Sequence, residues 1–360
     1  MNGTPHPCER FLREDLRDLQ PYHVEPFPHR VKLDANESPY DLPPAVKRRA
    51  LRELEELPFH RYPDPEAREL KAALSKRLDV PAEWLAVGNG SDELIQMLLI
   101  ALARPGTRVL APEPTFSMYR ILARVAGLPF VGVPLDERFE LNAEALRQEV
   151  ERSPRAIVFL SYPNNPTGNC WDEEVIRDLL GAPNAVFVLD EAYYEFSRRT
   201  FLPELGRRSN VLVLRTFSKA FGLAGLRVGI LIADPRWIGC VEKVRLPYNV
   251  NGVSQRIARI ALEHAEEIQR VVETIVAERR RLFEALAQEA RLEPFPSEAN
   301  FLLFRVRDGA AQAFRRLLDA GVLVRNLDRP GPLRDCLRVT VGRREENDQF
   351  LKALGVPANP

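Results

Sequence analysis

Lys219 lies among small and apolar residues, an unusual setting for an ammonium group. The stretch from Arg215 to Gly229 reads RTFSKAFGLAGLRVG, and Arg227 follows the lysine downstream. Burial away from water lowers the pKa of a lysine and makes its amine nucleophilic, which is the condition for forming a Schiff base with a carbonyl compound. The alternative is a solvated surface lysine, because lysine is seldom buried.

Two further polar groups follow apolar runs. Asp190 comes directly after AVFVL (185–189), and the segment SYPNNPTG (161–168) follows AIVFL (156–160). The aspartate can cap the next helix, or it can be a buried carboxylate that needs a cationic partner. The asparagines and prolines of the second segment are typical of a turn, which remains the simpler interpretation of that segment alone.

The segment AVGNGSDELIQMLLIAL (86–102) combines a strand-like start, a glycine-containing turn and an apolar helix. Exposed amides at the start of that helix favour an anion site. The alternative is a helix capped by Ser91, with Asp92 and Glu93 complementing the helix dipole. A dinucleotide motif begins at Gly88 but fails at Glu93, where the third glycine is required.

These residues need a scaffold that brings strand ends together. Short apolar runs alternate with helical stretches from about residue 85 to residue 233, and such runs are typical of strands buried on both faces. We therefore expect an α/β fold, with a mostly parallel sheet covered by helices on both faces and ligands bound beyond the carboxyl ends of the strands. The expected strands include 109–112, 156–160, 185–189, 211–214 and 228–233.

The chain divides into three parts. Residues 1–45 are proline-rich and predict an N-terminal arm, and residues 46–265 predict the large domain, which opens with a helix that Pro58 ends. Residues 266–360 predict a smaller α/β domain. Its first helix carries an apolar stripe over 266–290 without the sustained heptads of a coiled coil, and the segments NFLLFRV, VLVRNL and CLRVTVG predict strands.

Composition excludes several classes of function. The 51 basic and 51 acidic residues balance, so no overall field favours nucleic acid or an anionic membrane. The N-terminus lacks the apolar core of a secretory signal, and no apolar run approaches the length of a transmembrane helix. We expect a cytoplasmic protein without a metal site, because its cysteines are scattered and lack ligand spacing: Cys8, Cys170, Cys240 and Cys336.

Taken together, the motifs resemble the aspartate aminotransferase superfamily of pyridoxal-phosphate enzymes, fold type I, and most closely its histidinol-phosphate aminotransferase branch. The resemblance covers nearly the whole chain, with the motifs in the family's order. They are LDANESPY (33–40), RYPDP (61–65), NGSDEL (89–94), PTFSMY (114–119), YPNNPTG (162–168), DEAYYEF (190–196), TFSKAFGLAGLRVG (216–229), EANFLLF (298–304) and LRVTVGRREEND (337–348).

The resemblance implies catalytic roles for several residues. Lys219 would hold the cofactor and later move the α-proton as general base and acid. Asp190 would pair with the pyridine nitrogen, and Asn165 and Tyr193 would hydrogen-bond the phenolic oxygen. Phe116 would stack on the ring, although it replaces a tyrosine common in the family and so lacks a hydroxyl.

The resemblance also implies a site for the cofactor phosphate. The amides of Ser91 and Asp92 would bind it, and Thr216, Ser218 and Arg227 would complete the cradle. The arginine is needed because acidic side chains flank the anion, so that the partial charges of the helix terminus would be opposed.

Substrate and partner follow from the same resemblance. Arg338 and Arg325 would bind the substrate phosphate, alongside Asn165, although both arginines could also be surface residues. Tyr62 would reach the cofactor phosphate of a second subunit, which implies a homodimer with shared sites. Tyr22, in the arm, would cover the substrate.

The main hypothesis is a pyridoxal-phosphate aminotransferase that moves an amino group between glutamate and imidazole-acetol phosphate in histidine biosynthesis. An aromatic amino-acid aminotransferase and a threonine-phosphate decarboxylase share the scaffold and stay open as alternatives. A nucleotide-binding oxidoreductase using the 88–93 turn and a non-catalytic sensor are rivals from other classes.

Overall fold

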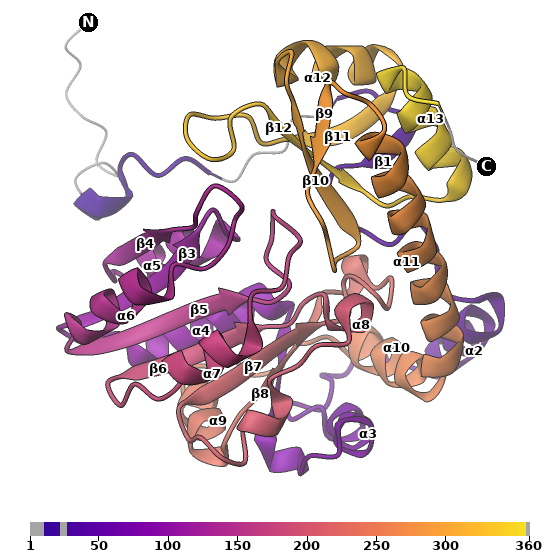
Figure 1. Cartoon of the computed structure of the whole chain (residues 1–360). Coiled ribbons are helices and arrows are strands. Elements are labelled where there is room, and N and C mark those ends of the chain that lie inside the picture. Colours follow the sequence, from indigo (N-terminus) through magenta and orange to yellow (C-terminus); the bar gives the residue numbers. More distant parts are fainter. Residues whose placement is uncertain (1–10, 22–26, 358–360) are drawn as a thin grey trace, which may run out of the picture.

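The computed structural model describes residues 11–21 and 27–357. Figure 1 shows a large sheet flanked by helices below and a smaller sheet with α12 and α13 above, while the long helix α11 runs between the two parts. The α/β class predicted from the sequence is confirmed.

The large sheet has seven strands in the order β2-β8-β7-β6-β5-β3-β4. Only β8 runs antiparallel to its neighbours, β2 and β7, and the remaining pairs are parallel. All five apolar runs form strands here, whereas β4 was not predicted. The strands are β2 (Leu85–Asn89), β3 (Thr107–Glu113), β4 (Phe130–Pro134), β5 (Arg155–Ser161), β6 (Ala185–Asp190), β7 (Val211–Thr216) and β8 (Val228–Ile232).

Helices cover both faces of this sheet because its strands are apolar on both sides. Alternate residues of β6 enter different clusters: Phe187 and Leu189 pack on one face, and Val186 and Val188 on the other. One face carries α4 (Ser91–Leu102), α5 (Met118–Val125) and α9 (Pro235–Glu242). The other carries α3 (Arg68–Leu78), α6 (Ala143–Glu151), α7 (Glu173–Leu179) and α10 (Gly252–Glu263).

The smaller sheet has the order β1-β11-β12-β10-β9. Its edge strand β1 (Val31–Leu33) pairs in parallel with β11, so part of the segment expected to be an arm belongs to this sheet. The other strands and their helices are β9 (Leu292–Pro294), β10 (Phe301–Val306), β11 (Val322–Asn326), β12 (Cys336–Thr340), α11 (Ala265–Ala287), α12 (Ala310–Asp319) and α13 (Arg344–Leu354). We propose the division predicted from the sequence, with β1 assigned to the small domain.

Short elements complete the chain. The first predicted helix is α2, and it ends before Pro58 as expected. The remaining bounds are α2 (Pro44–Glu55), α8 (Tyr194–Ser197), η1 (Glu14–Leu16), η2 (Ala82–Trp84), η3 (Leu202–Glu204) and η4 (Ala224–Leu226).

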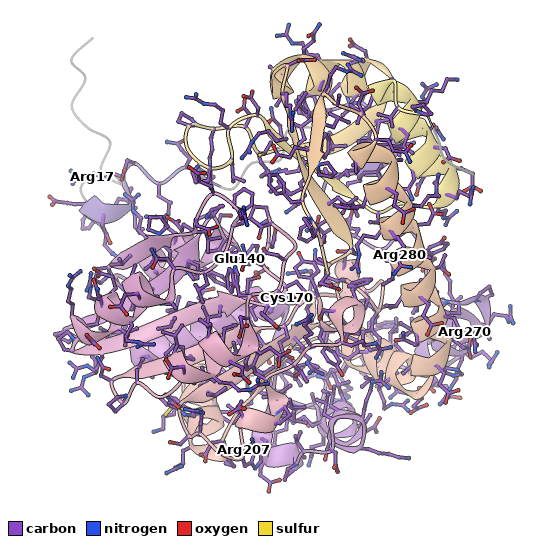
Figure 2. All side chains as sticks on the ribbon, in the orientation of Figure 1. Arg17, Glu140, Cys170, Arg207, Arg270 and Arg280 are labelled. Carbon is purple, nitrogen blue, oxygen red and sulfur yellow. The ribbon has the colours of Figure 1, made fainter. Side chains whose placement is uncertain are left out.

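Charged side chains of both signs stand over both parts of the molecule, in keeping with the balanced composition (Figure 2). Within residues 11–21 and 27–357, no helix is long and apolar enough to cross a bilayer. The same residues hold no cluster of side chains suited to a metal ion.

Candidate active site

Several of the predicted residues lie at or just beyond the carboxyl ends of β5, β6 and β7, where ligands bind in sheets of this kind. Ser161 at the end of β5 lies opposite Asp190 at the end of β6. Lys219 follows the end of β7 after a short loop. The polar residues that follow separate apolar runs in the sequence are therefore neighbours in space.

Lys219 extends from this loop towards the segment that follows β1. Its Nζ donates a hydrogen bond to the backbone oxygen of Ala35 at 3.1 Å. Burial lowers the pKa of the amine to about 8, and the nearby Arg338 guanidinium acts in the same direction. A substantial fraction of the amine is therefore neutral, and so nucleophilic, near pH 8.

Asp190 is a buried carboxylate held by neutral donors. The Tyr119 hydroxyl donates to its Oδ2 at 2.6 Å, and the amide of Ala192 donates to Oδ1 at 3.2 Å. Burial raises the pKa of Asp190 to about 6. The expected cationic partner is not supplied by the protein, because Asp190 makes no ion pair with any residue that the structure describes. A cation bound beside it would favour the ionised form.

Tyr193 is buried near Asp190, and its hydroxyl oxygen accepts a hydrogen bond from Asn36 Nδ2 at 3.0 Å. Burial raises the pKa of this phenol to about 12, so it stays protonated at neutral pH. The hydroxyl hydrogen can therefore be donated to a ligand.

The start of α4 has the shape of an anion site. Its N-cap is Gly90, with φ +83° and no capping side chain, so the alternative in which Ser91 caps the helix is wrong. A Cβ at Gly90 would lie 2.5 Å from Nη2 of Arg227, and one at Gly229 would lie 2.3 Å from the amide nitrogen of Ser91. Both glycines are required for this close approach, and the amides of the first turn keep their donors for an anion.

Hydroxyl and guanidinium groups surround that helix start. Arg227 donates through Nη1 to Ser218 Oγ at 3.3 Å and through Nη2 to Asp92 Oδ2 at 3.1 Å. The hydroxyls of Thr216 and Ser218 lie 3.0 Å apart. Glu93 is turned away and accepts hydrogen bonds from the amide of Asn89 and the side chain of Asn249. The structure thus brings together all five residues predicted for the cofactor phosphate.

The two predicted substrate arginines face each other across neighbouring strands. Arg325 on β11 is the cross-strand partner of Arg338 on β12. Arg338 donates to Asn165 Oδ1 at 2.5 Å and to the backbone oxygen of Asp34 at 2.9 Å. Arg325 forms no ion pair with the residues described. Like charges placed opposite each other destabilise a sheet, so a bound anion would relieve this pair.

The remaining predicted residues have mixed positions. Phe116 packs edge-on against Tyr119, with ring centroids 5.5 Å apart. Tyr62 is exposed and stacks on Tyr248 with ring centroids 4.4 Å apart. Tyr22 lies outside the residues that the structure describes.

Sequence reasoning missed two residues of the site, Tyr119 and Asn36. Both lie in motifs that were recognised, PTFSMY and LDANESPY, but neither received a role. Tyr119 is fully buried in α5, where its spacing matches that of core residues. Their hydrogen bonds to Asp190 and Tyr193 assign both to the site.

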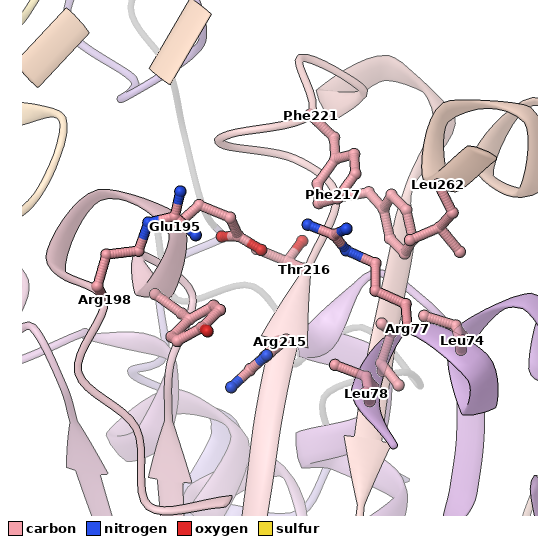
Figure 3. Close-up of a pocket in the computed structure, with 12 residues that line it drawn as sticks. Leu74, Arg77, Leu78, Glu195, Arg198, Arg215, Thr216, Phe217, Phe221 and Leu262 are labelled. Carbon is pink, nitrogen blue, oxygen red and sulfur yellow. The ribbon is translucent and has the colours of Figure 1, made fainter. Parts of the chain in front are cut away.

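A separate cavity of about 200 Å³ lies between β7 and the helices α3, α8 and α10. Figure 3 shows Arg77 and Glu195 directed into it beside Thr216. Thr216 is the only predicted site residue in its lining, and neither Lys219 nor Asp190 lines this cavity.

Comparison with known proteins identifies the fold and the family. The family model described as Aminotransferase class I and II matches residues 28–354. The chain belongs to this aminotransferase family. Histidinol-phosphate aminotransferase 2 from Nitrosococcus oceani is 44% identical over 96% of each chain. The corresponding aminotransferase of Aquifex aeolicus is 44% identical over 95% of this chain and 97% of its own.

A solved structure matches nearly as completely. The histidinol-phosphate aminotransferase of Sinorhizobium meliloti, solved in complex with pyridoxal-5′-phosphate, has a TM-score of 0.83 and 28% identity over 91% of this chain and 90% of that one. Aminotransferases of this family use pyridoxal phosphate as cofactor.

The residues of this aminotransferase fit the cofactor on two independent observations. Asp190 is a buried carboxylate with neutral partners, which a protonated pyridine nitrogen would satisfy. The start of α4 offers uncapped amides beside Arg227, which suit a phosphate. A site of this kind has a cation-binding end and an anion-binding end, as the cofactor requires.

Proposed function

We propose that this aminotransferase transfers an amino group from glutamate to imidazole-acetol phosphate, giving L-histidinol phosphate in histidine biosynthesis, with pyridoxal phosphate as cofactor. The observation that carries the proposal is the 44% identity to proteins named histidinol-phosphate aminotransferase over at least 95% of this chain. The match to the family model spans residues 28–354 and so includes every predicted site residue except Tyr22.

Each polar residue has a role in this reaction. Lys219 supplies the amine that attaches the cofactor and, once released by substrate, moves the α-proton; its lowered pKa suits both tasks. Asp190 would hold the pyridine nitrogen protonated, while Asn165 and Tyr193 would donate to the phenolic oxygen. Pyridoxal phosphate supplies the ring that takes up electrons when the α C–H bond breaks.

Two anion sites bind the two phosphates. The start of α4 with Thr216, Ser218 and Arg227 holds that of the cofactor. Arg325 and Arg338 hold that of the substrate, and their positions opposite each other support this assignment. A pair of guanidinium groups matches the charge and the several oxygens of a phosphate better than those of a single carboxylate. The arginine pair therefore favours histidinol phosphate over phenylalanine as substrate.

We also propose a cytoplasmic homodimer with shared active sites. Several large apolar side chains are exposed, among them Phe59 at 76%, Tyr62 at 81% and Leu246 at 72%. Tyr62 and Tyr248 stack on each other at the surface. Exposed apolar side chains of this kind support a partner surface, and Tyr62 is the residue assigned to the second subunit's cofactor phosphate.

Turnover of a substrate panel tests the reaction. With 2-oxoglutarate as acceptor, we expect kcat/KM for L-histidinol phosphate to exceed that for phenylalanine by about 100-fold, from the charge-assisted hydrogen bonds of two arginines. Preference for phenylalanine would establish the aromatic aminotransferase instead. Release of carbon dioxide from threonine phosphate would establish the decarboxylase.

Borohydride reduction tests the attachment site. The holoenzyme should yield a stable pyridoxyl adduct on the peptide that contains Lys219. Lys219→Ala should abolish both the adduct and turnover, whereas Lys243→Arg, at an exposed lysine on the large domain, should retain both. Full turnover by Lys219→Ala would refute the assignment.

A further inference from the structure

Asn36 connects the small domain to a residue of the large domain. It follows β1, which is paired with β11, and its side chain crosses to Tyr193 beside β6. Asn36 Nδ2 donates to the Tyr193 hydroxyl oxygen at 3.0 Å, and both residues are buried. No other hydrogen bond to a described residue involves the Tyr193 hydroxyl.

The backbone and side chain of Asn36 are held from several sides. Its amide donates to Thr340 Oγ1 at 2.9 Å, and its carbonyl oxygen accepts from Asn300 Nδ2 at 3.0 Å. The Thr340 hydroxyl faces Asn36 Oδ1 at 3.4 Å, which leaves Nδ2 directed at Tyr193. The φ of +55° lies in the left-handed region, which asparagine adopts more readily than most residues.

This hydrogen bond determines what the Tyr193 hydroxyl can do. A phenol oxygen that accepts from an amide keeps its own hydrogen for another acceptor, and accepting makes it a stronger donor. Because Asn36 Nδ2 is itself a donor, the Tyr193 hydroxyl does not donate its hydrogen to Asn36. The hydrogen is left for a ligand bound beside Tyr193.

We propose that Asn36 is a positioning residue that orients the Tyr193 hydroxyl towards the phenolic oxygen of the cofactor and strengthens its hydrogen bond. This inference rests on the proposed function. Because Asn36 is anchored by Thr340 and Asn300, the small domain must be seated on the large domain for the hydrogen bond to form. Tyr193 therefore acts at full strength only when the two domains are together.

The expected consequence is a shift in the titration of the bound cofactor. A hydrogen bond to the phenolic oxygen stabilises its negative charge most when the nitrogen that links Lys219 to the cofactor has lost its proton. The bond therefore lowers the pKa of that nitrogen. The charged groups near Tyr193 are Arg338 on β12, Asp190 at the end of β6 and Asp92 on α4, and none is altered by a substitution at Asn36.

The test is Asn36→Gly in the holoenzyme, titrated by its visible absorbance against pH. Glycine accepts the left-handed φ and keeps the backbone bonds to Thr340 and Asn300. The substitution removes the Nδ2 donor to Tyr193 together with the longer contact between Oδ1 and the Thr340 hydroxyl. We expect the pKa of the bound chromophore to rise by about 0.5–1 unit. Asp79→Gly, at an exposed position with φ +53°, is the matched control and should cause no shift.

A double-mutant cycle with Tyr193→Phe separates this role from a structural one. In the Tyr193→Phe background, Asn36→Gly should add no further shift, because the oxygen it acts on is gone. An unchanged chromophore pKa in Asn36→Gly, or an equal shift in both backgrounds, would overturn the inference. Failure of the wild-type protein to form the coloured holoenzyme would instead refute the proposed function.

Discussion

Asp190 and Glu191 are neighbouring buried carboxylates that lie on opposite faces of the large sheet. Glu191 pairs with Arg215 at 2.8 Å and also accepts from Thr200 and the amide of Phe201. Among the residues that the structure describes, the Asp190 carboxylate accepts hydrogen bonds only from the Tyr119 hydroxyl and the amide of Ala192. The alternation of a β-strand separates the two, because Asp190 continues the face of Val186 and Val188.

This difference distinguishes a structural carboxylate from a functional one. Burial of a charge is tolerated when a partner of opposite charge is built in, as for Glu191. Asp190 lacks that partner among the described residues, so a cationic ligand would stabilise its charge beyond what Tyr119 and the amide of Ala192 provide. Substitution of Asp190 should therefore lower kcat, whereas substitution of Glu191 should lower the free energy of unfolding.

The largest expected effect is on catalysis by Asp190→Asn. Asparagine has the same shape but no charge, so under the proposed role of Asp190 the pyridine nitrogen would lose its ionic partner. We expect kcat to fall by two to four orders of magnitude, from the loss of about 3–5 kcal/mol of pairing. The folded state should persist in thermal melts. A variant with kcat within a factor of three of wild type would contradict the assigned role.

Glu191→Gln should act on stability instead. It leaves the Arg215 guanidinium buried without its counter-charge, at a cost of about 3–5 kcal/mol in the free energy of unfolding. Urea unfolding measures this loss, and kcat per folded molecule should be retained. Asp178→Asn breaks an exposed ion pair with Arg147 and should cost less than about 1 kcal/mol. An equal loss in the free energy of unfolding for Glu191→Gln and Asp178→Asn would contradict the structural role of the buried ion pair.

The pH dependence of the apoenzyme gives a third test of the comparison. The folded-state pKa of Asp190 is raised to about 6 from 3.8, so its stabilising contribution is full below pH 3.8 and is lost as pH rises through 6. Relative to apo Asp190→Asn, the wild type should lose about 3 kcal/mol between pH 3.8 and 6. Parallel stability curves for the two proteins would contradict this pKa.

The smallest expected effect belongs to Tyr119→Phe. Its hydroxyl lowers the pKa of Asp190 by donating to the carboxylate, so its loss should raise that pKa further and weaken the pairing with the cofactor. A charge-assisted hydrogen bond contributes about 1.5–3 kcal/mol, which corresponds to a loss of about 10- to 100-fold in kcat/KM. Tyr162→Phe removes a buried hydroxyl bonded to a backbone oxygen and serves as control. It should leave kcat/KM nearly unchanged.

The sequence predicts most of this scaffold because its strands are buried on both faces and read as uninterrupted apolar runs. The antiparallel direction of β8 could not be predicted, because an apolar run does not indicate whether its strand is parallel or antiparallel to its neighbours. The expected arm overlapped β1, since a strand of three residues pairing with a partner near the other end of the chain leaves no local pattern.

The same limit applies to the site. Lys219 and Asp190 could be recognised because charged groups beside apolar runs are unusual. Tyr119 could not, since a tyrosine on an amphipathic helix resembles any core residue until its hydroxyl finds a carboxylate. Asn36 depends on Thr340 and Asn300, residues about 300 positions away that only the folded chain brings together.

The pairing of β1 with β11 has a consequence for synthesis of the protein. Val31 pairs with Val322, so 291 further residues (322 − 31) must be translated before its partner has been made. At about 5–20 residues per second, the N-terminal strand waits roughly 15–60 s for its neighbour to leave the ribosome. Ala35 and Asn36, which follow that strand, reach Lys219 and Tyr193 only after this delay. A segment translated well before Lys219 and Tyr193 is thus among the last to reach them.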